Sequence, residues 1–574
     1  MLHKHTRFQK HPRTLVERHH SEELEDTALL PEQLNKLQVS GAPVEDPSEH
    51  AEHLHYNVPQ RGVPEQRAYE LIHNELTLDG NPHLNLASFV NTSSTELARK
   101  LIMENVNKNL ADNDEYPQLI ELTQRCISMI SQMWKCDERD EPIGCATTGS
   151  SEAIMLGGLA MKKRWEGRMR AAGKSTARPN IIMSSACQVA LEKFARYFEV
   201  EAREVPVSSE SHHSLDTRNL WDFVDENTIG IFVILGTTYT GHFESIENVS
   251  DVLSEIEAQH PDWANKDIPI HVDGASGGFV VPFSFTDEQM AKTNNSRWGF
   301  HHPRVVSMNT SGHKFGLTTP GLGWVLWKSE HYLPEELRFK LKYLGGVEET
   351  FGLNFSRPGF QVVHQYYNFI SLGYQGYASR FARSLFVARS FSFGLLHSEV
   401  VPEGAFEVVS SIHLRISDGR VPQHAHEYWE HPDQYTPGVP LVAFKLSEKF
   451  HKQYPEIPQS MISGMLRSRG WIMPNYPLPH STDGSDKLEV LRVVFRSEMS
   501  LDLALMLLQD VEAVLNKAIK SYNTITHHVQ NLHSVDGRTE IYKLLSALSS
   551  PDTEDTEPEP EEHKHLKKNY RGTC

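Results

Sequence analysis

The chain of 574 residues is long enough for several domains, and its composition excludes three broad classes of protein. With 39% hydrophobic residues, 9 tryptophans and 25 phenylalanines, it can bury a large core and is not wholly disordered. No stretch approaches the roughly 20 apolar residues of a membrane-spanning helix, so no membrane partner is expected. The net charge of −19 repels phosphate backbones and disfavours nucleic-acid binding.

The cysteines and the first residues indicate a reducing compartment. Five cysteines are sparse, odd in number and contain no Cys-x-x-Cys pair, so a disulfide framework is not expected. The N-terminal residues lack the apolar core of a secretory signal. We therefore expect a soluble protein of the cytoplasm.

In chain order, the sequence predicts a polar arm followed by a large α/β region. Residues 1–65 are polar, rich in histidine and interrupted by proline and glycine, which predicts a flexible arm. The expected helices are 98–110, 116–134, 151–170, 189–198 and 249–258, and the expected strands are 180–183, 230–235, 268–272, 304–308 and 323–327. This alternation is typical of a mainly parallel sheet covered by helices on both faces.

The pattern changes near residue 385. Strands and helices no longer alternate strictly there, which predicts a smaller α+β domain over residues 385–547. Residues 548–574 hold acids among prolines and then four basic residues, and are expected to form a disordered tail. The acidic opening and the lack of tryptophan are unlike a calmodulin-binding helix, so calmodulin is not an expected partner.

Three predicted strand ends carry side chains suited to chemistry. Residues 147–152 (Thr-Thr-Gly-Ser-Ser-Glu) form a turn into a helix, whose N–H groups and hydroxyls suit a phosphate. The strand 268–272 leads to Asp273 and then to small residues, and the strand 304–308 leads to Lys314 beside His313. Taken singly, helix capping and a surface lysine explain all three.

Taken together, the three strand ends favour one cofactor. Pyridoxal 5′-phosphate requires a lysine for its Schiff base, an acid at its pyridine nitrogen and an anion site for its phosphate. The serine turn, Asp273 and Lys314 supply these groups in that order along the chain.

Longer motifs from about Leu71 to Arg496 carry a family resemblance. They include residues 73–76 (HNEL), 79–81 (DGN), 107–109 (NKN), 115–118 (EYPQ), 237–241 (TTYTG) and 354–358 (NFSRP). In these motifs the chain resembles the group II pyridoxal-phosphate decarboxylases, and within them the glutamate decarboxylases, above all the fungal members. The resemblance implies α-decarboxylation of L-glutamate to 4-aminobutanoate and carbon dioxide.

The resemblance also implies a fold and an assembly. The fold is α/β, of the fold-type I transferase-like class of pyridoxal-phosphate enzymes, with a large cofactor domain at residues 86–384 and the smaller domain after it. Residues 66–85 are expected to pack on a dimer. The active assembly is expected to be a homodimer or a higher oligomer of dimers.

Individual roles follow from the resemblance. Lys314 is expected to carry the cofactor, Asp273 to keep its ring nitrogen protonated, and His313 to contact it beside the lysine. The expected catalytic residues are these three, with Lys314 or His313 as the candidate proton donor to Cα. The other expected cofactor contacts are Ser150, Ser151, Gln188, Thr238, Ala275, Ser311, Phe355 and Ser356, with Ser356 reaching the phosphate of a second subunit. The expected substrate contacts are Ser88, Phe89, Asn109 and Asp112 for the distal carboxylate and Arg492 for the α-carboxylate.

Other interpretations stay open from the residues alone. They are a decarboxylase of an aromatic or sulfinic amino acid, a non-catalytic scaffold with this fold, and a carbon–carbon lyase of lipid metabolism. Residues 167–175 nearly spell a nucleotide-binding loop, but five residues separate the glycines and the segment ends a helix. The histidine pairs at 212–213, 301–302 and 527–528 lack metal-ligand spacing, so we expect loop or surface positions and no metal.

Overall fold

The computed structural model describes residues 58, 62–112, 114–341, 348–528, 538–539, 541–542 and 544–545. The chain divides between Asp79 and Gly80 into two units. In the first unit, helix α4 (Glu65–Leu76) buries none of its side chains. The predicted arm, apart from residues 58 and 62–65, and the predicted tail lie outside the described residues.

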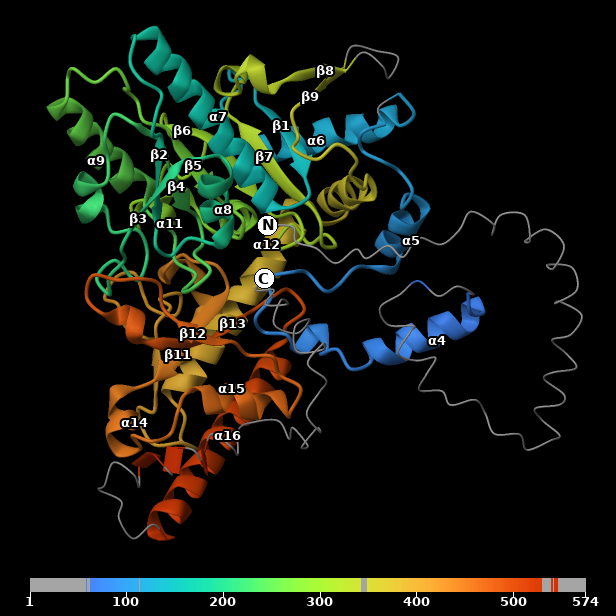
Figure 1. Cartoon of the computed structure of the whole chain (residues 1–574). Helices are drawn as coiled ribbons and strands as arrows, with labels where there is room; N and C mark the ends of the chain where they lie inside the picture. The colour runs from blue at the N-terminus through green and yellow to red at the C-terminus, as the bar shows by residue number, and fades with distance from the viewer. Residues whose placement is uncertain are drawn as a thin grey trace, which may run out of the picture. The chain divides into compact units, whose positions relative to one another are not determined.

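A seven-stranded sheet forms the centre of the large domain (Figure 1). Its spatial order is β1 (Ile143–Thr147), β7 (Gly323–Trp327), β6 (Val305–Thr310), β5 (Ile270–Asp273), β4 (Thr228–Ile234), β2 (Asn180–Ser184) and β3 (Glu201–Val205). Strand β7 is antiparallel to both of its neighbours, and the other pairs are parallel. Six strands therefore share one direction, which confirms the predicted mainly parallel sheet.

Helices cover both faces of this sheet because its strands are apolar on both sides. In β4, Ile231 and Val233 face one core together with α6, α9 and α10. Phe232 and Ile234 alternate with them and face the core under α7 and α8. The helices of this domain are α5 (Glu96–Glu104), α6 (Pro117–Met133), α7 (Ser150–Ala171), α8 (Val189–Tyr197), α9 (Ile246–Gln259), α10 (Gly277–Ser284) and α11 (Asp287–Ala291).

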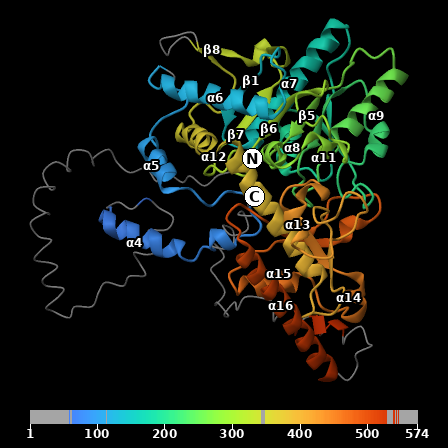
Figure 2. The ribbon, with the colours of Figure 1, turned by 180° about the vertical axis from the view of Figure 1, so that it is seen from behind.

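A long helix, α12 (Phe360–Leu396), joins the large domain to the small one (Figures 1 and 2). It kinks at Gly373, whose φ of 58° lies in the left-handed region that glycine tolerates. Phe381 belongs to the core of the large domain, whereas Phe391 belongs to that of the small domain. The core thus changes within the helix, close to the predicted boundary at residue 385.

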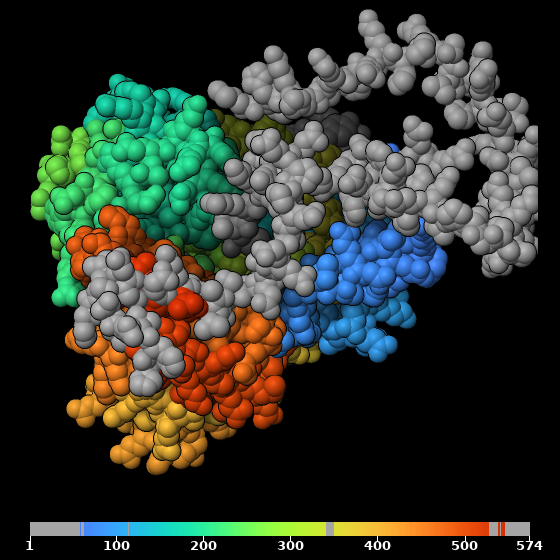
Figure 3. Space-filling view, turned by 60° about the horizontal axis from the view of Figure 1, so that its bottom comes forward, coloured from blue at the N-terminus to red at the C-terminus, as the bar shows by residue number. Residues whose placement is uncertain are grey.

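The small domain is an antiparallel sheet packed with helices. Its strands, in spatial order, are β10 (Phe406–Val408), β11 (Leu441–Leu446), β13 (Glu489–Val494) and β12 (Asn475–Pro477). Its helices are α13 (Glu427–Glu430), α14 (Glu448–Gln453), α15 (Ser460–Arg467) and α16 (Leu501–His528). In the space-filling view it lies against the green part of the large domain (Figure 3).

Short elements complete the described structure. A two-stranded sheet pairs β8 (Phe339–Leu341) with β9 (Glu348–Thr350). The 3-10 helices are η1 (Pro82–Leu84), η2 (Thr217–Asp222), η3 (Glu330–Tyr332), η4 (Glu335–Leu337), η5 (Pro432–Gln434) and η6 (Ser485–Lys487). Within the described ranges, no helix has the length and apolar character needed to cross a bilayer.

Two differences from the predicted elements have physical reasons. The helix expected over 98–110 ends at Glu104, where the Asn105 side chain donates to the carbonyl of Leu101 and competes with the helical pattern. Strand β3 was not expected, because its sequence Glu-Ala-Arg-Glu-Val is mostly exposed at the sheet edge and carries no apolar run.

Candidate active site

The carboxyl ends of the parallel strands bring predicted cofactor residues together at one edge of the sheet. The hydroxyls of Ser150 and Ser311, which follow β1 and β6, lie 2.7 Å apart. The Ala275 N–H donates to Asp273 Oδ1 at 3.0 Å, and the Ser311 N–H donates to the Ala275 carbonyl at 3.3 Å. Gln188, after β2, caps α8 by accepting from the Ala190 N–H at 2.7 Å.

The start of α7 is suited to an anion. Gly149 precedes it with a φ of 150°, and no side chain caps the N–H groups of its first turn. Ser150 is buried beside these groups, whereas Ser151 is exposed. A Cβ atom on Gly149 would lie 3.4 Å from the His313 ring, so glycine leaves space between this turn and the imidazole. Uncapped N–H groups and two hydroxyls fit a phosphate.

Lys314 lies at this edge of the sheet, and its surroundings and lowered pKa favour imine formation. Its Nζ atom lies 5.0 Å from the centroid of the Phe89 ring. Burial lowers the pKa of Lys314 to about 8, so about one amine in ten is neutral at pH 7. Burial and the lysine charge lower the pKa of His313 to about 4, and His313 Nδ1 is buried without a partner among the described residues.

Buried amides hold the loop that carries Lys314. Leu317 has a φ of 65°, an unfavourable conformation for a leucine. Its carbonyl accepts from Asn91 Nδ2 at 3.0 Å and from Asn368 Nδ2 at 2.9 Å. Gln365 on α12 donates to the neighbouring Gly316 carbonyl at 3.1 Å. The strained turn is therefore fixed from both sides, and the lysine with it.

Arg492 of the small domain also lies over the Phe89 ring. Its guanidinium carbon is 5.1 Å from the Phe89 ring centroid and 5.3 Å from that of Tyr476. Arg492 Nη1 donates to the Thr238 carbonyl at 2.7 Å, and Arg492 Nε is buried without a partner in the described part of the chain. Tyr476 was not predicted, since its strand β12 has only three residues and no apolar pattern.

A second group of predicted residues lies where the segment between α5 and α6 meets the segment that leads into α12. Asn109 Nδ2 is 3.4 Å from the Ser356 hydroxyl, and Asn109 Oδ1 accepts from the Arg357 N–H at 3.0 Å. Asp112 is joined to Asn109 through a backbone hydrogen bond of 3.2 Å. No hydrogen bond or ring contact among the described residues joins this group to Lys314 or Arg492.

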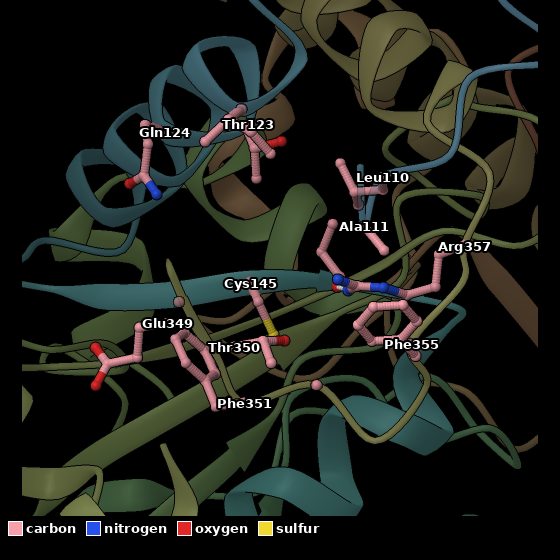
Figure 4. A pocket seen from close by; sticks show the side chains of 14 residues that line it. Leu110, Ala111, Thr123, Gln124, Cys145, Glu349, Thr350, Phe351, Phe355 and Arg357 are labelled. Carbon is pink, nitrogen blue, oxygen red and sulfur yellow. Dashed lines mark hydrogen bonds between the residues drawn. The ribbon is translucent and has the colours of Figure 1, made fainter. Parts of the chain in front are cut away.

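A small cavity of about 120 Å³ lies beside this second group (Figure 4). Figure 4 shows the Arg357 guanidinium group between Ala111 and Phe355, and it donates to the Ala146 carbonyl of β1. Phe355 is 46% exposed, and Ser356 is exposed beside it. These two side chains therefore face away from the core of their own subunit.

The buried carboxylate of Glu152 ties the serine turn to the second group. It accepts from the Thr148 N–H at 2.7 Å and the Thr148 hydroxyl at 2.9 Å. It also accepts from the N–H groups of Leu353 at 3.1 Å and Asn354 at 3.2 Å. Sequence reasoning treated Glu152 only as part of the turn, although an acid in the first turn of a helix is a common stabilising feature.

The histidine pairs correct one expectation. His213 and His302 are buried, not at the surface. Burial lowers the pKa of both imidazoles, and that of His302 reaches about 4. Residues 167–175 span the end of α7 at Ala171, as the sequence indicated. Within the part of the chain that is described, no three candidate ligands converge on a metal site.

Buried neutral histidines predict that the protein loses stability in mild acid. Burial lowers the pKa of His242 to about 3 and that of His271 and His413 to about 4. Above pH 6.5, histidine is neutral in both the folded and the unfolded chain. As the pH is lowered from 6.5 to 4, these histidines take up protons in the unfolded chain but not in the folded one. The free energy of unfolding therefore decreases as the pH is lowered.

Thermal melting of the protein checks this prediction. We expect Tm to fall by about 5 °C or more between pH 7.5 and pH 5. Burial raises the pKa of Glu244 to about 7, and its contribution to stability is lost as pH rises through that value. That opposing effect comes from one group, whereas burial lowers the pKa not only of these three histidines but also of His302 and His313 to about 4, so an equal or higher Tm at pH 5 would contradict the prediction.

The residues at the sheet edge fit pyridoxal phosphate in three respects. A lysine with a lowered pKa, a strand-end carboxylate and an uncapped helix start lie where the aldehyde, ring nitrogen and phosphate would bind. Such a site on a mainly parallel sheet with a smaller domain beside it defines the class of fold-type I pyridoxal-phosphate enzymes.

Comparison with known proteins places the chain within that class. Residues 60–416 match the family described as "Pyridoxal-dependent decarboxylase conserved domain". A glutamate decarboxylase of Saccharomyces cerevisiae is 67% identical over 527 residues, which are 90% of each chain. Glutamate decarboxylase 5 of Arabidopsis thaliana is 40% identical and covers 86% of this chain and 90% of its own. The chain belongs to the pyridoxal-dependent decarboxylases, and among them to the glutamate decarboxylase family.

A solved structure agrees with this assignment. The glutamate decarboxylase of Lactobacillus brevis is 33% identical, with a TM-score of 0.68. The match covers 80% of this chain and 94% of that one. The expected fold class and cofactor are thus confirmed at the level of the family.

Proposed function

We propose that the protein decarboxylates L-glutamate at Cα, giving 4-aminobutanoate and carbon dioxide, with pyridoxal phosphate held by Lys314. The observation that carries this proposal is the placement of Lys314 and Arg492, which both lie over the Phe89 ring at 5.0 and 5.1 Å from its centroid, with Asp273 close enough to Lys314 to raise its pKa against the effect of burial. Sparse cysteines and the absence of a membrane-crossing helix among the described residues support a cytoplasmic location.

Each residue has a task in this reaction. When bound, pyridoxal phosphate supplies the electron sink for the pair left on Cα as carbon dioxide departs. Asp273 presents a carboxylate to the ring nitrogen and favours its protonated form. Lys314 Nζ, with a pKa near 8, can bind the cofactor as a neutral amine and later carry the proton delivered to Cα.

The cation of Arg492 binds and orients the substrate α-carboxylate. Its guanidinium plane is fixed by Phe89, Tyr476 and the Thr238 carbonyl, so little side-chain freedom remains to be lost on binding. A fixed carboxylate holds the Cα–carboxylate bond in one orientation. One proton is consumed per glutamate, since the departing carbon dioxide is replaced by hydrogen.

We propose a homodimer in which Ser356, Asn109 and Asp112 serve the site of the other subunit. Ser356 and Phe355 are exposed, and Asn109 and Asp112 lie with them and apart from Lys314. These residues therefore have no site of their own to complete within the described subunit. This division explains why the predicted set separates into two groups.

An exposed apolar surface next to Ser356 supports a second copy as the partner. A groove of about 390 Å³ runs between α5, α6 and α12. The side chains of Leu97, Met103, Ile370 and Tyr374 on these helices are each more than 60% exposed. Lys108 lines the groove, and its backbone carbonyl accepts from the Gly359 N–H at 2.7 Å, so the groove adjoins the Ser356 segment. Apolar surface of this kind is typical of a subunit interface.

Product analysis tests the proposed function. Purified protein with pyridoxal phosphate and L-glutamate should release 4-aminobutanoate and carbon dioxide in equal amounts. A panel of aromatic and sulfinic amino acids distinguishes the related decarboxylases. Turnover of one of these in place of glutamate, or cofactor binding without any turnover, would instead favour another decarboxylase or a non-catalytic scaffold.

Asp112 gives a prediction about substrate choice. In Asp112→Asn, we expect the preference for glutamate over glutamine, measured as the ratio of kcat/KM values, to fall about ten-fold. The Asp112 carboxyl and the γ-carboxylate of glutamate can bind as a pair that shares one proton, whereas an asparagine can donate both to a carboxylate and to the glutamine carbonyl, so the variant no longer favours the acid. Asp114→Asn, which makes the same substitution at an exposed acid two residues further on, is the control. An unchanged ratio in Asp112→Asn would remove this residue from the substrate pocket.

A further inference from the structure

A buried row of polar side chains ends on Asp273. The Ser307 hydroxyl is 2.7 Å from His271 Nδ1, and His271 Nε2 is 2.8 Å from Asn309 Oδ1. Asn309 Nδ2 then donates to Asp273 Oδ1 at 2.9 Å. Ser307, His271 and Asn309 are each completely buried, and Asp273 is 4% exposed.

The strand register makes this row possible. His271 and Asp273 alternate with apolar residues along β5 and point to the same face of the sheet. Ser307 and Asn309 do the same on β6, and each lies directly opposite its partner in the parallel pair. Gly157 of α7 leaves room for the imidazole, since a Cβ atom there would lie 2.4 Å from the His271 ring.

The direction of every hydrogen bond in the row follows from the carboxylate at its end. Asn309 must present its NH₂ group to Asp273, because two acceptor oxygens would repel each other. Its carbonyl oxygen therefore faces His271 Nε2, which has to carry the ring hydrogen. His271 Nδ1 then accepts from the Ser307 hydroxyl. Burial lowers the pKa of His271 to about 4, which agrees with a neutral ring.

The row determines which oxygen of Asp273 is left for the cofactor. The hydrogen bonds from Asn309 and from the Ala275 N–H both go to Oδ1. Among the described residues, no hydrogen bond goes to Oδ2. Two donors on one oxygen hold the plane of the carboxylate.

We infer that Asn309, His271 and Ser307 are positioning residues that fix the plane of the Asp273 carboxylate, with Oδ2 directed at the ring nitrogen of pyridoxal phosphate. The inference rests on the proposed role of Asp273. It explains why four polar side chains occupy the inside of a sheet where apolar residues would avoid the cost of burial. Without the Asn309 donor, the carboxylate can rotate, and the ring nitrogen holds its proton less firmly.

The test compares Asn309→Leu with a matched buried asparagine. Asn265 is also completely buried, accepts from Arg168 Nη2 at 2.7 Å and donates to the Thr228 carbonyl at the amino end of β4. Asn265→Leu should lower stability without touching the cofactor. In Asn309→Leu, we expect the dissociation constant of pyridoxal phosphate to rise about ten-fold or more. We also expect the ¹⁵N NMR signal of the labelled ring nitrogen to move toward the neutral pyridine position.

Two results would overturn the inference. One is an Asn309→Leu protein whose ring-nitrogen signal and cofactor affinity equal those of the Asn265→Leu protein. The other comes from the unmodified holoenzyme and can be obtained even if Asn309→Leu does not fold. There, ¹⁵N NMR should show a neutral His271 ring with its hydrogen on Nε2. A hydrogen on Nδ1 would contradict the proposed row of hydrogen bonds.

A further variant shows whether a negative result concerns the positioning row or the proposed role of Asp273 on which it rests. Asp273→Asn should move the ring-nitrogen signal at least as far as Asn309→Leu. If Asp273→Asn leaves the signal of the protonated nitrogen unchanged, the proposed role of Asp273 is wrong. If only the Asn309 variant leaves it unchanged, the role of Asp273 stands and the positioning row is wrong.

Discussion

Replacement of Lys314 by alanine should abolish turnover, with a loss of about a thousand-fold or more, and remove the visible absorption of the bound cofactor. The lysine supplies both the nitrogen that binds the cofactor and a proton carrier at Cα, and proton transfer alone contributes about 10²–10⁴-fold. Burial lowers the pKa of Lys314 to about 8, so the unmodified protein has a neutral amine available near pH 8.

A second lysine provides the control for this prediction. Lys445 is 8% exposed and pairs with Glu407 at 2.8 Å in the small domain. Lys445→Ala should lower stability and leave the visible absorption unchanged. Borohydride reduction followed by peptide mapping should find the cofactor on Lys314, and its attachment to another lysine would refute the assignment of the whole site.

Much of this site could be predicted because its groups follow strands that the sequence makes visible. Asp273 is the last residue of β5 and Lys314 is the fourth residue after β6, and parallel strands bring their carboxyl ends to one edge. The serine turn needed only its own sequence, since a glycine followed by two serines and an acid is typical of a helix start. The roles of Arg492 and Phe89 came from the family resemblance, because no local pattern joins residues so far apart in the chain.

The parts that escaped prediction depend on pairing between segments. His271 and Asn309 belong to strands that were expected, but their contact arises from a register of β5 against β6 that periodicity does not specify. Glu152 reaches Leu353 across about 200 residues, and a single carboxylate gives no sign of such a partner. Buried polar networks are therefore the features that only the structure supplies.

Introducing a negative charge at Ser356 should abolish cofactor binding in the site of the other subunit. Ser356 is exposed in its own subunit, so Ser356→Glu is expected to fold with little change in Tm. In the proposed dimer, the new carboxylate faces the cofactor phosphate, and we expect activity to fall about a hundred-fold or more because two close anions repel in a partly buried site. Ser356→Ala, which adds no charge, should retain most of the activity.

Mixed dimers decide whether Ser356 acts within its own subunit or across the interface. Ser356→Glu and Lys314→Ala proteins are each inactive, but a dimer with one chain of each kind contains one site without either substitution if Ser356 acts across the interface. If subunits of the two variants are mixed in equal amounts and exchange at random, half of the dimers contain one chain of each variant. Each mixed dimer has one intact site out of two, so about a quarter of the activity of the unmodified protein should return. If Ser356 acts on its own subunit, every site in the mixture carries one substitution, and no activity returns.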